Sequence, residues 1–290
     1  MNTSKISLKH FFIFFVVIII LLLTAGCIIN SETIDNVDNN RYAAKADFYY
    51  QTSAYSFDKF VLKGINGTVE ISTIANLDTI TIEGERIVES ESITDAEEHL
   101  QYLLVDISHN LNFILVETVQ PSNSNGRNYK VNYRILIPQD WDIDIEQING
   151  NVDVTGLNGD IRVVVTNGNI SISSCQGNVH TIITNGNSSF SDITGCIYSS
   201  IVNGNSTGHI ALSDSGTCQQ TTVNGNLILS IPRSTSAQFS AKTSNGLVTV
   251  NNLPLNNAQV TNKSVSGVLG SGEGVVTIEA VNGLITVNGY

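Results

Sequence analysis

Hydrophobic and polar positions recur on a fixed grid after Trp141, where a short turn motif returns every nine residues. The motifs on this grid are Asn149-Gly150, Asn158-Gly159, Asn167-Gly168, Gln176-Gly177, Asn185-Gly186, Thr194-Gly195 and Asn203-Gly204. Strict Asn-Gly recurs at every second grid position from Asn149 to Asn203, and then at a slightly longer interval, at Asn224 and Asn245. A period of about 20 residues is typical of repeat architectures. The pattern therefore predicts a stack of similar units.

The two residues at each turn explain how such units stack. Asn and Gly tolerate positive φ, so Asn-Gly turns the chain at little steric cost. Turns at fixed spacing let each coil lie on the one before, and aligned asparagines can form hydrogen-bonded ladders. The predicted turn ladder consists of Asn149, Gly150, Asn167, Gly168, Asn185, Gly186, Asn203, Gly204, Asn224, Gly225, Asn245 and Gly246. We favour an all-β solenoid with coils of about 18–21 residues over a meander or propeller of hairpins, because hairpins need not keep this grid.

Residues two and four positions after each glycine are mostly apolar and alternate with polar ones, the period of a strand with one buried face. They are predicted to point inward as one continuous core: Val152, Val154, Ile161, Val163, Ile170, Ile172, Val179, Thr181, Ser188, Phe190, Ile197 and Ser199. Near the C-terminus the grid breaks at Leu253-Pro254-Leu255, and Gly270–Gly274 indicates a tight loop between two strands. Because terminal repeats must cover an exposed coil end, we interpret this part as a cap.

Residues 42–140 form a β-rich entry region with one predicted helix. Short β-prone runs include Phe60–Leu62, Thr68–Ile71 and Val131–Ile137. Thr94 and Glu97 have the spacing of a capping box, so we expect a helix from Thr94 to about Leu104. The predicted domain thus spans residues 42–290, with the entry region followed by the repeat array and cap at 141–290.

The N-terminus has the composition of a secretory signal. Two lysines precede the apolar run Phe11–Leu23, and Thr24–Cys27 follows. The Ala-Gly-Cys ending resembles the lipobox of exported lipoproteins, which implies a signal peptide over residues 1–26 and lipidation of Cys27. The alternative is an uncleaved anchor to residue 29, since Phe11–Ile29 approaches the roughly 20 residues that span a bilayer. Residues 27–41 are a polar tether, and both readings place the rest of the chain outside the cytoplasm.

The composition of the chain limits which classes of partner it can bind. The net charge is −12 with a pI of about 4.7, which argues against nucleic acid as a partner. The chain has 33 asparagines against 14 lysines and arginines, and 11 of its 23 glycines follow an asparagine. Asparagine and glycine therefore supply turn chemistry, and the surface they line is neutral and polar.

Several segments together resemble a known family. They are Gly64–Ile71, Ile135–Pro138 before the array, the recurring Asn-Gly-Asn units, Gly272–Gly274, and Ile278–Val287. The chain is similar over about residues 57–287 to the "putative adhesin" family of envelope β-solenoid domains. This resemblance implies a solenoid fold and a role in surface adhesion, and its motifs specify structure more than activity.

Neither a metal site nor a catalytic site is expected, and the sequence implies no cofactor. The residues after the turn glycines are mostly Asn, with Asp160 the one acid, whereas Ca²⁺ needs six to eight oxygens including several carboxylates. Acids after Asn149 are too sparse to indicate paired carboxylates: Asp153, Asp160, Asp192, Asp214, Glu273 and Glu279. His99 is expected on the helix, and His180 and His209 on outward strand positions.

Cysteines and sequons leave alternatives open. Cys175, Cys196 and Cys218 follow one another at a spacing close to one coil, so neighbours can form a disulfide or remain buried thiols. Asn-x-Ser/Thr sequons occur at Asn66, Asn169, Asn187, Asn205 and Asn262, and three of them recur at the period of the Asn-Gly turns. They are candidate N-glycosylation sites aligned along one edge, or simple by-products of the repeat.

The sequence therefore predicts a non-catalytic, membrane-tethered surface protein of the cell envelope. Its expected role is adhesion or binding of envelope or extracellular carbohydrate or other polymers, through a long face lined by Asn, Ser and Thr. Two other classes compete. An envelope sensor or scaffold with a protein partner would expose apolar or aromatic residues on one face. A carbohydrate-active enzyme would need two carboxylates that meet in a groove.

Overall fold

The computed structural model of the protein describes residues 40–212 and 215–290. The predicted signal peptide, the lipidation site Cys27 and nearly all of the tether lie outside these residues. In the described part, no helix is long and apolar enough to cross a membrane. The described residues belong to one compact unit, which consists of two facing β-sheets, here called sheet A and sheet B.

Each sheet is a long ladder of strands, and within the described residues sheet A has 11 and sheet B has 12. Sheet A follows the order β1 (Tyr42–Ser53), β4 (Thr79–Ser90), β7 (Asn128–Pro138), β3 (Val69–Ile74), β9 (Val152–Thr155), β11 (Ile170–Ser173), β13 (Ser188–Thr194), β15 (Ser206–Ala211), β17 (Leu227–Ile231), β23 (Ile285–Gly289) and β19 (Val248–Asn251). Sheet B follows the order β20 (Asn256–Val260), β21 (Ser264–Leu269), β18 (Ala237–Asn245), β22 (Gly274–Asn282), β16 (Thr217–Asn224), β14 (Ile197–Asn203), β12 (Val179–Asn185), β10 (Ile161–Asn167), β8 (Asp142–Asn149), β2 (Lys59–Asn66), β6 (Phe113–Val119) and β5 (Leu104–Asn110).

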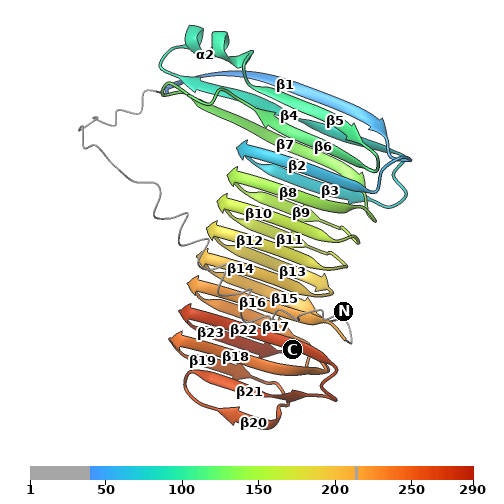
Figure 1. Ribbon diagram of the computed structural model, residues 1–290, viewed down its shortest axis with the longest axis vertical. Coiled ribbons are helices and arrows are strands. Elements are labelled where there is room, and N and C mark those ends of the chain that lie inside the picture. The colour runs from blue at the N-terminus through green and yellow to red at the C-terminus, as the bar shows by residue number, and fades with distance from the viewer. Residues whose placement is uncertain (1–39, 213–214) are drawn as a thin grey trace, which may run out of the picture. The chain divides into compact units, whose positions relative to one another are not determined.

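The repeat array is a β-solenoid, as the sequence predicts (Figure 1). Each coil contributes one strand to sheet B, turns at Asn-Gly, and contributes the next strand to sheet A. Strands of successive coils are parallel and in register, so Ile161 of β10 pairs with Val179 of β12, which pairs with Ile197 of β14. Two intervals of the grid therefore make one coil.

The core lies between the sheets and consists of the positions predicted to point inward. All twelve of them are buried, from Val152 to Ser199. The polar ones hydrogen-bond to their equivalents in the next coil: Thr181 to Ser199 at 3.0 Å and Ser188 to Ser206 at 2.8 Å. Stacking identical small hydroxyls thus satisfies polar groups that would otherwise destabilise the core.

The stack begins well before Trp141. Strands β2 and β3 form a coil that lies directly on β8 and β9, with Phe60 paired to Ile143 and Val69 to Val152. Strands β7, β4 and β1 extend sheet A, and β6 and β5 extend sheet B. The entry region and the repeat array therefore share one continuous core.

The structure confirms a helix at the predicted place, but the predicted cap and the predicted end of the helix are wrong. Among the described residues the one α-helix is α2 (Ile93–Leu100), and its N-cap is Ser92, whose hydroxyl accepts from the Asp95 amide at 3.1 Å. Thr94 lies inside the first turn and is not the cap. The helix ends four residues early because Leu104 already begins strand β5.

The C-terminal part contains the expected cap and an unexpected insertion. The β20–β21 hairpin covers one side of β18, and a tight loop joins β21 to β22, as predicted. Strands β22 and β23, however, lie between the coil β16–β17 and the coil β18–β19, pairing in parallel with both. Figure 1 shows this red C-terminal coil between two orange coils. The spatial order of the last coils thus differs from their order along the chain.

Candidate functional site

A row of charged and aromatic side chains crosses five neighbouring strands on the outer face of sheet A. In the strand register Tyr49 pairs with Glu83, Glu83 with Arg134, Arg134 with Glu70, and Glu70 with Asp153. Alternate residues of a strand point to opposite faces, so these five share the face turned away from the core. The row brings together chain segments that are far apart in sequence.

The row lines a groove of about 710 Å³. The groove lies where the antiparallel strands β1, β4 and β7 meet the parallel strands β3 and β9. Its walls are polar and apolar in comparable measure and consist of Tyr49, Glu70, Ile71, Ser72, Thr81, Glu83, Arg134, Ile135, Leu136, Asp153 and Thr155. On the parallel strands beyond β9 most outer positions are short hydroxyl residues, so the groove opens on that side onto a hydroxyl-lined face: Ser171, Ser173, Ser189, Ser191 and Thr207.

Negative charge dominates the groove. It holds three carboxylates and one guanidinium, and Arg134 Nε lies 3.4 Å from Glu83 Oε1. Partial burial and the nearby charge of Glu70 raise the pKa of Asp153, while a hydrogen bond from Ser171 opposes this rise. The groove thus offers strong hydrogen-bond acceptors, one fork-shaped donor in Arg134 and the ring of Tyr49, which is 62% exposed.

Comparison with known proteins identifies the fold family. The model of the family described as Toastrack DUF4097 matches residues 142–288, just over half of the chain. The chain belongs to the Toastrack DUF4097 family. This supports the resemblance to solenoid adhesin domains, although the match begins at residue 142 whereas the resemblance in the sequence extends from about residue 57.

Two solved structures align with this chain at low similarity. A "putative cell adhesion protein" from Clostridium sporogenes aligns with 14% identity and a TM-score of 0.39, covering 85% of this chain and all of that one. A "putative adhesin" from Bacteroides fragilis aligns with 10% identity and a TM-score of 0.39, covering 85% of this chain and 98% of that one. Among curated proteins, none is significantly similar to this chain. Identities this low say nothing about a shared ligand.

The asparagine ladder of this Toastrack chain is built as predicted, with side-chain amides hydrogen-bonded from coil to coil. In each pair the Nδ2 of one asparagine donates to the Oδ1 of the neighbour, at 2.7–2.9 Å. The ladder runs Asn66, Asn149, Asn167, Asn185, Asn203, Asn224, Asn282 and Asn245. Because each amide inside the ladder donates one hydrogen bond and accepts another, the ladder stabilises the stack, and one N–H and one oxygen lone pair of each amide still face solvent.

The sequons align along this edge, as the repeat suggests. Asn169 and Asn187 donate from Nδ2 to the preceding coil at 3.1–3.2 Å, and Asn205 does the same at 3.2 Å. All three are exposed, as is Asn262, whereas Asn66 is half-buried and donates to the Tyr129 carbonyl at 2.8 Å. A glycan on Asn66 would therefore disrupt the hydrogen bond that joins β2 to β7, and Asn66 is the one sequon asparagine of the five that is half-buried.

The three cysteines of the described residues lie in the core as buried thiols, and the structure contains no disulfide among them. Cys218 is next to Cys196, with which it shares a hydrogen bond, and its sulfur accepts from the Ile197 amide at 3.4 Å. Burial raises the pKa of the Cys218 thiol to about 12 and also raises that of Cys175. Of the two alternatives, the structure contains the buried-thiol form.

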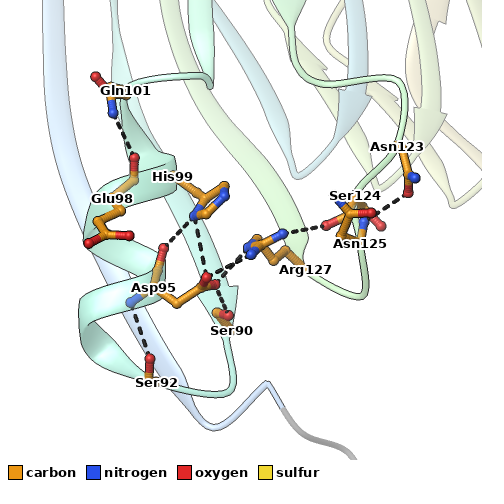
Figure 2. Close-up of polar contacts among 10 residues, drawn as sticks. All are labelled: Ser90, Ser92, Asp95, Glu98, His99, Gln101, Asn123, Ser124, Asn125 and Arg127. Atoms are coloured by element: carbon orange, nitrogen blue, oxygen red, sulfur yellow. Dashed lines mark hydrogen bonds and ion pairs between the residues drawn. The ribbon is translucent and has the colours of Figure 1, made fainter.

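A second polar cluster lies at α2 and contains Ser, Asp and His (Figure 2). Arg127 forms a bidentate pair with Asp95, both contacts at 2.6 Å, and Ser90 also donates to this carboxylate. His99 Nδ1 lies 2.8 Å from the Asp95 carbonyl oxygen. In a nucleophilic triad the histidine bonds to the serine, whereas here Ser90 bonds to Asp95. The cluster therefore anchors the helix to the loop before β7.

The histidines lie where the sequence predicts. His99 is on α2, and His180 and His209 are exposed on outward strand positions. Within residues 40–212 and 215–290, no group of His, Cys, Asp and Glu has the geometry of a metal site. The groove residues Tyr49, Glu70, Glu83 and Arg134 were missed, because nothing local in the sequence shows that they share a face with Asp153.

Proposed function

We propose that this protein is a non-catalytic binding protein of the cell surface, whose groove on sheet A holds a segment of an envelope or extracellular polysaccharide. The observation that supports this most is the in-register row from Tyr49 to Asp153. A sugar ring presents an apolar face that suits the Tyr49 ring and hydroxyls that suit carboxylate and guanidinium groups. The hydroxyl-lined strands beyond Asp153 extend the contact surface along a polymer.

An open groove fits a polymer better than a small molecule. Sites for small molecules bury most of the ligand in a concave and largely apolar cavity. Here Tyr49, Glu70 and Asp153 are all exposed, and the groove opens onto sheet A. A chain of sugars would lie across the strands and make many weak hydrogen bonds, so affinity would come from the number of contacts.

Binding of the full chain to purified polysaccharides tests the proposal. The probes are insoluble envelope and extracellular polysaccharides in co-sedimentation, and soluble ones in calorimetry. Tyr49→Ala is expected to weaken binding roughly tenfold, equivalent to about 1.4 kcal/mol. Tyr198→Ala removes an exposed tyrosine from the opposite sheet and serves as the matched control. Equal binding by the two variants would contradict the proposal.

The juxtaposition of Glu70 and Asp153 supports a second candidate, glycan hydrolysis. Carboxylates on directly paired strands, about 4.8 Å apart at the backbone, approach the separation seen in retaining glycosidases. The raised pKa of Asp153 also suits a general acid. We favour binding because both side chains are exposed in an open groove. Measuring new reducing ends separates the two: their release by wild type, and not by Glu70→Gln, would establish hydrolysis.

A protein partner, the role of a sensor or scaffold, has one observation in its favour. On the last coils, four apolar side chains beside the ladder are exposed: Val223, Leu247, Val281 and Leu284. Scattered exposed residues need no explanation, but neighbouring ones can mark an interface. Replacing both leucines by serine and comparing cross-linked partners on cells tests this alternative.

Tethering through a lipid on Cys27 completes the proposal, and it rests on the N-terminal sequence alone. Metabolic labelling with a fatty-acid analogue is expected to mark the wild-type chain and not Cys27→Ser. Label in the variant would contradict lipidation at this residue. Retention of unlabelled protein in the membrane fraction would instead indicate an uncleaved anchor.

A further inference from the structure

The coil β22–β23 fills a slot between two coils that both precede it in the chain. After β17 the chain passes through residues 232–236 and forms β18 and β19, which do not pair with β16 and β17. Strands β22 and β23 lie between them, so the two flanking coils are separated by two strand spacings, roughly 9–10 Å. The slot therefore accepts one coil with a free strand edge on each side.

The contacts in this slot are as complete as those inside the repeat array. Val276, Ile278, Ala280, Ile285 and Val287 are buried in the common core. On the backbone, the Gly225 amide donates to the Asn282 carbonyl at 2.9 Å, and the Gly283 amide donates to the Asn245 carbonyl at 3.0 Å. The coil thus provides both neighbours with their missing partners.

Asn282 and Asn288 continue the side-chain ladders through the inserted coil. Asn282 donates to Asn224 at 2.8 Å and accepts from Asn245 at 2.9 Å, and Asn288 accepts from Asn251 at 3.0 Å. These contacts depend on the sequence of residues 274–290 and not on which chain supplies them. Covalently, the loop 270–273 joins this coil to the strands that precede it.

This loop has the properties of an exchange hinge. It is four residues long, and Gly270 and Gly272 adopt positive φ, at 55° and 81°. The hydroxyl of Ser236 accepts from the amides of Ser271, Gly272 and Glu273 at 3.0–3.3 Å, which holds the turn closed. Short hinge loops that hold a tight turn favour domain swapping when the turn opens.

We propose that copies of this protein exchange their C-terminal coils, so that residues 274–290 of one copy fill the slot of a second copy. An open slot presents free strand edges on the coils β16–β17 and β18–β19. The coil β22–β23 of another copy has the sequence that pairs with both of them. Strand insertion of this kind obtains affinity from backbone hydrogen bonds and specificity from the inward side chains. Reciprocal exchange gives a closed dimer, and one-way exchange gives a chain of molecules.

A disulfide trap between β18 and β22 tests the proposal in the full chain. Ser240 and Thr277 pair directly and lie on the outer face of sheet B. One chain carries Ser240→Cys, the other carries Thr277→Cys, and the two are unfolded together, refolded and oxidised. The expected product is an interchain disulfide whose yield rises with chain concentration and which is absent when folded chains are mixed.

Two further variants keep the test decisive. A chain with both cysteines must form the intrachain disulfide when refolded at low concentration, which shows that the positions are competent and the chain folds. Gly270→Val together with Gly272→Val disfavours the positive φ of the hinge and is expected to increase the interchain yield. The proposal is wrong if the double-cysteine chain forms its intrachain disulfide while neither the wild-type hinge nor the hinge with both valines gives an interchain disulfide.

Discussion

Asn282 donates from Nδ2 to Asn224 Oδ1 at 2.8 Å, although 58 residues separate them in the chain. From Asn149 to Asn224 the ladder partners are 18 or 21 residues apart. The C-terminal coil thus enters the ladder out of sequence order and completes it. The same chemistry that makes the repeats stack therefore also joins the coil β16–β17 to the coil β18–β19 through the inserted coil.

Removing one asparagine from the middle of the ladder should weaken the fold. Asn185 donates to Asn167 at 2.8 Å and accepts from Asn203 at 2.9 Å, so Asn185→Ala removes two hydrogen bonds. We expect a loss of about 1–2 kcal/mol in the free energy of unfolding, measured with urea. Ser189→Ala, at an exposed position on β13, is the control, and an equal loss in both variants would contradict a structural role of the ladder.

The ladder glycines should be irreplaceable for a reason beyond their φ. A Cβ on Gly186 would lie 1.8 Å from the Gly168 carbonyl oxygen in the preceding coil, and φ is 148°. We expect Gly186→Ala to cost ~3 kcal/mol or to prevent folding. Gly126 also has positive φ, 85°, but has no heavy atom within 4 Å of an added Cβ. Gly126→Ala should therefore cost only ~1 kcal/mol, and similar costs for both would show that close packing of the coils is not decisive.

Stability should depend on pH through Asp95. Hydrogen bonds from Arg127 and Ser90 hold the pKa of this carboxyl well below its ordinary value. A carboxyl whose pKa is lower in the folded than in the unfolded state stabilises the protein at pH values above its unfolded-state pKa, about 4. This contribution is lost as the pH falls from there towards the folded-state pKa. The thermal midpoint of wild type should fall more steeply below pH 4 than that of Asp95→Asn. Asp47→Asn is the charge-matched control, and parallel pH profiles for wild type and Asp95→Asn would contradict the assignment.

The thiols should react only after unfolding. Burial raises the pKa of Cys218 to about 12, so little thiolate exists at pH 8 and the sulfur is inaccessible. Mass spectrometry after alkylation should show Cys175, Cys196 and Cys218 unmodified in the folded protein and modified in denaturant. A mass two units lower than the thiol form, reversed by reductant, would instead show a disulfide between neighbouring coils.

Much of the fold follows from local chemistry, and the candidate site does not. Val152 and Ile170 are predictable as core residues because a strand alternates its faces and an Asn-Gly turn fixes the register. The position of Asn282 between Asn224 and Asn245 is not predictable from the sequence. An asparagine on this grid could equally well stack on Asn245 alone, in the order of the chain. The ladder chemistry specifies that coils stack without specifying which coils are neighbours.

The groove is less predictable still. Glu70, Arg134 and Asp153 come from three segments that become neighbours only because the coil β2–β3 lies between β7 and β9 on sheet A. Each alone is an ordinary outward residue of a half-exposed strand. The start of the helix is ambiguous in the sequence for a similar reason. Two residue pairs have the spacing of a cap, Thr94 with Glu97 and Ser92 with Asp95. The contact of Asp95 with Arg127 forms only in the tertiary structure.

Binding of polysaccharide in the groove on sheet A can be measured by co-sedimentation of the full chain with envelope polysaccharides. Wild type and Tyr198→Ala should bind alike, while Tyr49→Ala should bind roughly tenfold more weakly. Loss of binding in Tyr198→Ala with full binding in Tyr49→Ala would place the contact on the opposite sheet. That result would contradict the account, as would the same affinity in all three proteins.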